Sequence, residues 1–332
     1  MYIEQAFKGK SSGARYIIGA LAIFFSWSCL QIIPFFIALS IKYGYNEKMM
    51  AIFLDQNSLM TSFNSNTTFF LMLLGFALSL LFLFLLYKII HKNSITNLTT
   101  SRQKIDWSRI WFSFSTIAIL NIVLILVDYF FVSPDDYVFN FNLVPFLILT
   151  LIAVVFVPLQ TSFEEYFFRG YLMQGIGIKT KYRWIPLMIT SFIFGAMHYA
   201  NPEVAQMGDL VMVSYFGTAL MLGIMTLMDE GLELSLGFHA ANNLVASLLV
   251  TADWTAFNTE SILKDISNPT ADWEVWIGAL VINPIILFIY AKRYKWNNWG
   301  NRLFGKVQQP IVSHASDGTA DIEDLSDLGK DY

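Results

Sequence analysis

The chain has 332 residues, of which 55% are hydrophobic and only 14% are charged, and its formal net charge is −4. Soluble proteins of ordinary composition carry about 25% charged residues, so this composition argues against a soluble globular protein and for an integral membrane protein. The single cysteine, Cys29, excludes intrachain disulfides and cysteine-based zinc sites.

Long apolar stretches predict eight transmembrane helices, because a helix needs about 20 apolar residues to cross the hydrocarbon core. The predicted spans are 16–41, 68–90, 110–132, 143–162, 184–200, 210–228, 233–251 and 274–292. The fifth is short, and the sixth and seventh are closely connected. The predicted fold class is an all-α, polytopic transmembrane helix bundle.

Lysine and arginine predict the orientation of these spans, because both residues concentrate on the cytoplasmic side of a membrane. Of the 21 lysines and arginines, the alternate connections hold only Lys42, Lys48 and Lys264. The others flank the opposite set of connections and both ends of the chain. We therefore expect both termini to be cytoplasmic and the loop 253–272 to lie outside.

The same pattern divides the chain into four regions. Residues 1–142 form an N-terminal three-helix membrane region, and 143–252 form a membrane core that holds the motifs described below. Residues 293–332 follow an outer loop and last helix at 253–292, and we expect them to be cytoplasmic and partly disordered, because the sequence turns polar and acidic after Val307. His314, in this tail, is expected to titrate in water.

The first motif follows directly on the apolar run 143–159 and contains Glu164, Glu165 and Arg169. Ionisable groups at or inside a membrane helix are costly and are functional-site candidates. Residues four apart share a helix face, so Glu165 and Arg169 can pair, which leaves Glu164 about 100° away round the helix. The alternative is an ion pair at the membrane edge that reaches toward the headgroups.

Two histidines lie inside predicted spans. His198 ends the stretch Phe194-Gly-Ala-Met-His198, and Phe194 can pack beside its ring from one turn away. His239 begins the stretch His239-Ala-Ala-Asn-Asn243, where either Asn242 or Asn243 can share its face. One histidine in a span is more often a helix-to-helix hydrogen-bond partner than a catalyst, but two of them with a carboxylate pair indicate a site.

These residues fit two kinds of amide hydrolysis. In the first, Glu164, His198 and His239 bind zinc and leave a fourth position for a water of lowered pKa. In the second, no metal is used: Glu164 and His198 hold and deprotonate the water, while His239 and Asn243 stabilise the oxyanion. The zincin motif His-Glu-x-x-His is absent. No serine stands out in the neighbourhood of both histidines, which argues against a Ser-His-Asp mechanism.

The three stretches together resemble the CPBP family of intramembrane proteases, which includes the CAAX prenyl endopeptidases and bacterial proteins linked to bacteriocin processing and self-immunity. The family pattern is Glu-Glu-x-x-x-Arg, Phe-x-x-x-His and His-x-x-x-Asn. Its matches here are Glu164, Glu165, Arg169, Phe194, His198, His239 and Asn243. The resemblance covers about 143–251.

The resemblance implies that Glu164 and His198 activate the water, that His239 and Asn243 complete the site, and that Glu165 and Arg169 form a supporting pair. It also implies a cavity that opens toward the cytoplasm. The predicted spans place His198 about 20 Å along its helix, which is too deep to meet a Glu164 at the inner edge. We therefore expect the fourth helix to continue past Arg169, or the fifth to start later.

The sequence thus predicts an intramembrane endopeptidase in a prokaryotic plasma (inner) membrane. The expected partners are the lipid bilayer and a peptide or membrane-tethered protein substrate, with no nucleic acid; the oligomeric state is not indicated. Zinc is the one cofactor considered. The alternatives are a non-catalytic immunity or scaffold protein that binds peptides, and a proton or metal transporter.

Overall fold

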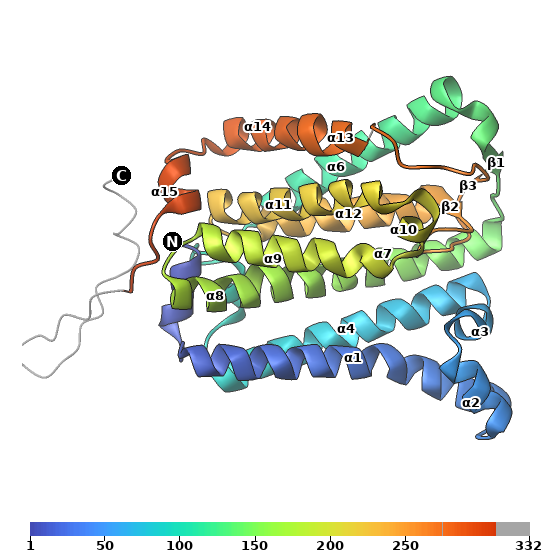
Figure 1. Ribbon diagram of the computed structural model, residues 1–332, viewed down its shortest axis with the longest axis horizontal. Coiled ribbons are helices and arrows are strands. Elements are labelled where there is room, and N and C mark those ends of the chain that lie inside the picture. Colours follow the sequence, from blue (N-terminus) through green and yellow to red (C-terminus); the bar gives the residue numbers. More distant parts are fainter. Residues whose placement is uncertain (274, 310–332) are drawn as a thin grey trace, which may run out of the picture.

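The computed structural model describes residues 1–273 and 275–309, and it is an all-α bundle whose long helices run roughly side by side (Figure 1). The α-helices are α1 (Gly13–Tyr43), α2 (Glu47–Leu54), α3 (Gln56–Thr61), α4 (Ser65–His91), α5 (Ile95–Thr99), α6 (Trp107–Val127), α7 (Leu143–Glu165), α8 (Met173–Thr180), α9 (Trp184–Met197), α10 (Pro202–Met207), α11 (Met212–Asp229), α12 (Glu233–Leu249), α13 (Val275–Ile277), α14 (Asn283–Tyr294) and α15 (Trp299–Phe304). The all-α, polytopic fold class is confirmed. The predicted disorder of the acidic tail and the prediction for His314 concern residues outside the described ranges.

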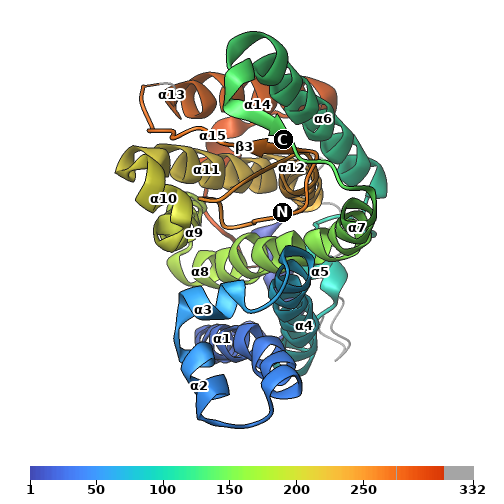
Figure 2. The ribbon, with the colours of Figure 1, turned by 90° about the vertical axis from the view of Figure 1, so that its right-hand side faces the viewer.

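The helices form layers. α1 and α4 pack together on one side, the continuous helix α7–α8 follows with α9, then α11 and α12, and finally α6 and α14 (Figures 1 and 2). α12 lies inside this arrangement, packed against α6, α7 and α11. Its residues from Glu233 to Ala241 are all buried, so the innermost helix is the one that carries His239.

Six helices are long and apolar enough to cross a membrane, which is two fewer than predicted. Helices do form at the two remaining predicted spans. The stretch Trp184–Ala200 is a shorter apolar helix, and α12 has 17 residues and many buried polar side chains. α9 exposes large apolar side chains such as Met188 and Phe192, whereas α12 is buried by its neighbours from Glu233 to Ala241. The predicted count of eight spans is not confirmed.

The fourth predicted span, 143–162, is shorter than the helix in the structure. α7 does not end at residue 162 but continues through a π-helical turn, Tyr166–Leu172, into α8, which gives one helix of 38 residues, Leu143–Thr180. Glu164 therefore lies about 24 Å from the Thr180 end, and His198 lies about 21 Å from Trp184 at the start of α9. The mismatch in depth inferred from the sequence disappears.

Three short strands join the loops at the end of the bundle that is opposite α15, and the sequence did not predict them (Figure 1). The order is β1-β3-β2, with β1 (Tyr137–Phe139) antiparallel and β2 (Val250–Ala252) parallel to β3 (Leu263–Asp265). β1 immediately precedes α7 and β2 immediately follows α12. The sheet therefore ties together one end of the two helices that carry Glu164 and His239.

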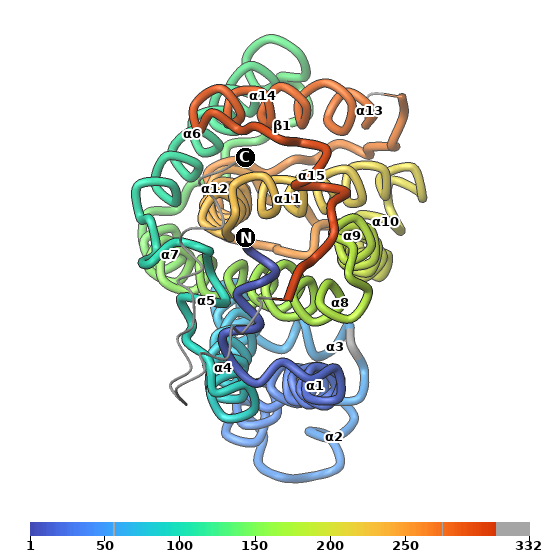
Figure 3. Tube along the Cα trace, turned by 90° about the vertical axis from the view of Figure 1, so that its left-hand side faces the viewer, coloured from blue at the N-terminus to red at the C-terminus, as the bar shows by residue number. Residues whose placement is uncertain are grey.

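The N-terminal 3-10 helix, Ile3–Lys8, and α15 lie at the same end of the bundle (Figures 1 and 3). Arg183 forms an ion pair with Glu4 there, and the backbone N–H of Val307 donates to the carbonyl of Lys181 at 3.0 Å. This agrees with an even number of crossings. That this end faces the cytoplasm stays a prediction.

Candidate active site

Glu165 and Arg169 form an ion pair that is fully buried, with 3.0 Å between Arg169 Nη1 and Glu165 Oε1. Further hydrogen bonds to a buried pair offset part of the cost of taking its charges out of water. Arg169 Nη2 donates to the backbone carbonyl of Ala219 in α11 at 3.0 Å, and its guanidinium lies 4.1 Å from the centre of the Phe194 ring. The motif arginine therefore links α7, α9 and α11.

His239 lies between the two adjacent carboxylates. Its Nδ1 is 2.8 Å from Glu165 Oε1, and its Nε2 is 3.4 Å from Glu164 Oε2. A carboxylate that is paired with arginine is ionised and can only accept hydrogen bonds. His239 Nδ1 therefore carries a hydrogen and donates a hydrogen bond to Glu165. Glu165 thus fixes the orientation of the ring and turns Nε2 toward Glu164.

The two glutamates play different parts because of the local helix geometry. Glu165 is fully buried, whereas the side chain of Glu164 is 13% exposed. They are the last residues of regular α-helix before the π-helical turn at Tyr166, and such turns occur frequently at functional sites. Glu164 is therefore the carboxylate that a substrate or a water molecule can reach.

His198 lies near this group without touching it. Its Nδ1 donates to the carbonyl of Phe194 at 2.8 Å, and its ring stacks on Tyr215 with centres 4.5 Å apart. The Phe194 ring lies between the two imidazoles, 4.8 Å from His198 and 5.9 Å from His239. Within the described chain, His198 makes no hydrogen bond to Glu164 or His239, which leaves its Nε2 free.

The two asparagines face different helices, which the sequence alone left open. Asn243 donates to Gln160 Oε1 in α7 at 3.2 Å, whereas Asn242 accepts from Asn121 in α6 at 3.1 Å. Asn243 is therefore the residue on the side of Glu164. Sequence reasoning missed Gln160, although a glutamine four residues before Glu164 in an apolar run was a usable signal. It also missed Tyr215, which nothing distinguishes from other aromatic residues.

The predicted zinc ligands do not meet round a common point. Among residues 1–273 and 275–309, no group of three or more His, Cys, Asp or Glu side chains is arranged to hold a metal ion. His239 Nδ1 is directed at Glu165, and His198 Nδ1 at a backbone carbonyl. As they lie, Glu164, His198 and His239 do not fit a zinc centre. Use of zinc itself stays an untested prediction.

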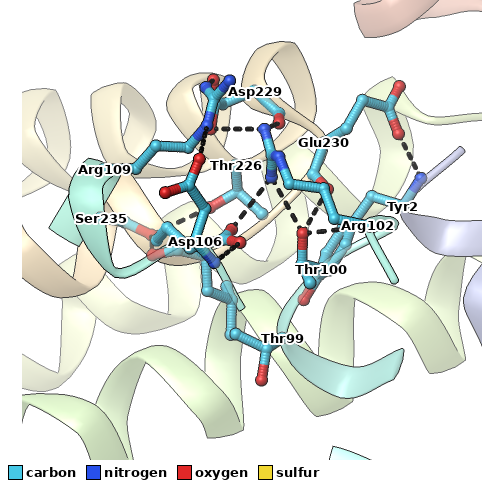
Figure 4. A network of polar contacts seen from close by, with 12 residues as sticks. Tyr2, Thr99, Thr100, Arg102, Asp106, Arg109, Thr226, Asp229, Glu230 and Ser235 are labelled. Carbon is cyan, nitrogen blue, oxygen red and sulfur yellow. Dashed lines mark hydrogen bonds and ion pairs between the residues drawn. The ribbon is translucent and has the colours of Figure 1, made fainter. Parts of the chain in front are cut away.

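A second polar cluster holds the turn between α11 and α12 (Figure 4). Arg102 Nη2 is 3.0 Å from Asp229 Oδ2, and its Nη1 is 3.2 Å from Glu233 Oε2. Arg109 also pairs with Asp229, and Trp296 donates to that carboxylate at 3.1 Å. In the sequence, these arginines contribute only to the predicted orientation of the spans. Their structural effect is to fix the start of α12, six residues before His239.

The sequence is similar to that of known proteins. Residues 142–245 match the family "Type II CAAX prenyl endopeptidase Rce1-like", a range that includes all three motifs. A relative from Bacillus subtilis (strain 168), the uncharacterized protein YyaK, is 31% identical over 218 residues, which is 64% of this chain and 72% of the relative. The chain belongs to the Rce1-like family. No solved structure matches it.

Membership in this family and the six apolar helices establish an integral membrane protein of a protease family. The family match begins at residue 142, so helices α1, α4 and α6 lie outside it. The Rce1-like region nevertheless depends on them, because α4 packs against α7 and α6 packs against α12.

Proposed function

We propose that this Rce1-like protein is an intramembrane endopeptidase that hydrolyses a peptide bond of a membrane-associated peptide or protein with a water activated by glutamate. The observation that carries this proposal is the placement of His239 between Glu164 and Glu165, inside the bundle. A purely structural ion pair needs only Glu165 and Arg169. The partly accessible second carboxylate beside an oriented imidazole is what a general base requires.

In the proposed reaction, the Glu164 carboxylate takes a proton from water as the water oxygen forms a bond to the substrate carbonyl carbon. The carbonyl π electrons move to the oxygen and give a tetrahedral oxyanion. When this intermediate collapses, the C–N bond breaks and Glu164 returns the proton to the leaving amine. No oxidant or reductant is needed, and the carboxylate ends in its starting state.

The neighbouring residues stabilise the charge that develops. His239, held by Glu165, supplies its Nε2 edge to the oxyanion once that nitrogen is protonated, and Asn243 supplies an amide N–H. His198 Nε2, free of other partners, is assigned to hold the attacking water. Glu165 and Arg169 act as positioning residues, since they contact His239 and Phe194 rather than the reacting atoms.

The first experiment compares cells that carry the intact protein with cells that carry Glu164→Gln. Mass spectrometry of membrane fractions identifies peptides and proteins that accumulate uncut in the variant. The matched control is Glu47→Gln, which alters an exposed glutamate at the start of α2. We expect cleavage to fall by at least about 100-fold in Glu164→Gln only. Equal processing by the folded variant and the intact protein would remove the enzyme proposal in favour of a binding or transport role.

A further inference from the structure

Four side-chain amides form a continuous row across three helices. Asn121 in α6 donates to Asn242 at 3.1 Å, Asn242 donates to Asn243 at 3.2 Å, and Asn243 donates to Gln160 in α7 at 3.2 Å. We call these four residues the amide row. It begins at the proposed site and leads away from it. The family motif includes only one of its members, Asn243.

The outer part of the amide row is open to the membrane. Asn242 is exposed and Asn121 is partly exposed, and Ala246, one turn after Asn242 on α12, is exposed as well. α6 and α7 both pack against α12, but Asn242 turns to the first and Asn243 to the second. A strip of α12 that carries Asn242 and Ala246 therefore remains uncovered between its two neighbours.

The depth of these amides makes them costly. Asn121 lies near the middle of the span Trp107–Val132, about 21 Å from its start. The residues beside it face lipid, with Ile119 62% exposed and Val123 49% exposed. Polar side chains at this depth almost always face a partner or a pathway. Exposure of the Asn121 and Asn242 amides to hydrocarbon is energetically unfavourable, so we expect these groups to have a function.

The amide row is not saturated by its own hydrogen bonds. Each asparagine has two N–H donors and an oxygen with two acceptor positions. Among the described residues, Asn121 donates one N–H to Asn242, which leaves its second N–H and its oxygen unused, and Asn242 likewise keeps one N–H. These free groups are one acceptor and two donors in the membrane, beside the proposed catalytic Asn243.

A substrate supplies the complementary groups. A peptide bond inside a membrane helix must be unwound before water can attack it, and the N–H and C=O groups freed by unwinding have no water to bond at that depth. Side-chain amides carry the same donor and acceptor as a peptide group. We propose that Asn121 and Asn242 are a binding subsite for the unwound backbone of the substrate, next to the scissile bond.

This inference rests on the proposed function and makes it more specific. The subsite recognises backbone rather than side chains, so it favours any apolar peptide segment that can be unwound at this depth. The competing explanation is that Asn121 and Asn242 only join α6 to α12, as amides between membrane helices often do. The two explanations differ in whether the backbone N–H groups of a bound peptide matter.

The test is peptide binding to the full chain in lipid nanodiscs, in a Glu164→Gln background so that the probe is not consumed. The first probe is a dye-labelled peptide of ten Leu, Ala and Val residues. The second has the same sequence with alternate backbone nitrogens methylated, which removes donors. The test variant is Asn121→Leu with Asn242→Leu. The matched control is Asn66→Leu, which removes a buried amide that joins α4 to α7 through the Pro145 carbonyl at 2.8 Å.

We expect the double variant to bind the unmodified peptide about three- to tenfold more weakly. It should lose less affinity for the methylated peptide, because that peptide cannot bond to the Asn121 oxygen even in the parent. Asn66→Leu should leave both affinities unchanged. Equal changes for both peptides, no change for either, or no binding by the parent would overturn the subsite. Cleavage of the unmodified peptide by the chain with Glu164 intact is measured separately. Absent cleavage with the expected binding pattern would count against the proposed enzyme alone.

Discussion

At the scale of single residues, Glu165 is the centre of the candidate site. One oxygen, Oε1, accepts from both Arg169 and His239, while Oε2 is buried without a partner among the described residues. A single acceptor shared by two donors couples their positions. Loss of the arginine should therefore alter the position of the imidazole, because both side chains bond to the same carboxylate oxygen.

The first prediction concerns this coupling. Arg169→Met leaves an unpaired buried carboxylate and should destabilise the fold by about 3–5 kcal/mol. Glu165→Gln combined with Arg169→Met should cost less than the two single substitutions added together, because no charge is left uncompensated. Thermal unfolding in detergent, followed by tryptophan fluorescence, measures this. Strictly additive losses would show that the two residues act independently.

A second prediction assigns Gln160 as a positioning residue for Asn243. Gln160→Leu removes the acceptor that holds the Asn243 amide, so kcat for the substrate identified in cells should fall about tenfold with little change in KM. Asn243→Ala should lower kcat further, and the double variant should be no slower than Asn243→Ala. If the fold reduction in kcat of the double variant equalled the product of the reductions in the two single variants, this assignment would be wrong.

At the scale of elements, the turn between α11 and α12 sets the position of His239 along the axis of α12. The cluster of Arg102, Arg109, Asp229 and Glu233 holds the start of α12 against the loop before α6. Asp229 and Glu233 are almost fully buried. A helix that begins in such a cluster cannot slide along its axis without exposing unpaired charges, which fixes His239 against Glu165.

The third prediction tests this long-range effect. Arg102→Met should lower both the unfolding temperature and the rate of cleavage, although residue 102 is not part of the site, because Asp229 and Glu233 each lose an ion-pair partner. Lys104→Met, in the same loop and exposed, is the control and should change neither. If the Arg102 variant were as active and stable as the control, α12 would not depend on the cluster.

At the scale of the whole molecule, the sequence predicted most of the helices. The motif residues lie on α7 and the π-helical turn that continues it, at the end of α9, and on α12. The apolar run predicts a fourth span that ends at residue 162, whereas the depth of His198 predicts a helix that continues past Arg169, and the structure has the longer helix. In fact, Arg169 is buried by contacts with Ala219 and Phe194, which are remote in sequence.

Other features depended on long-range packing that no local pattern reveals. The choice between Asn242 and Asn243 is made by which neighbouring helix each residue faces. The contact of His239 with both carboxylates requires the α11–α12 turn to hold α12 at one axial position relative to α7. The strands are three residues each, too short to leave a periodic signal, and β1 pairs with β3 from more than 100 residues away.

The fourth prediction concerns metal. Because the predicted ligands Glu164, His198 and His239 do not meet round one point, purified protein treated with a chelator and dialysed should retain its rate of peptide cleavage, and metal analysis should find well below one zinc per chain. Loss of activity with the chelator, restored by zinc alone, would show that these side chains rearrange round a metal.

The fifth prediction tests orientation, and the single cysteine makes it direct. After Cys29→Ser, a cysteine is placed at Lys181, at the end near α15, or at exposed Thr270, in the predicted outer loop. A membrane-impermeant maleimide added to intact cells should label Thr270→Cys and not Lys181→Cys, and lysis should make both reactive. The reverse pattern would invert the topology.

The small sheet has a mechanical consequence. β1 lies between α6 and α7 in the chain, and β3 pairs it with β2 at the end of α12. The sheet therefore connects three helices at one end of the bundle. The charged turn before α12 holds that helix near the other end. α9 has no strand in this sheet, so His198, which directly follows α9, is not restrained by it as Glu164 and His239 are.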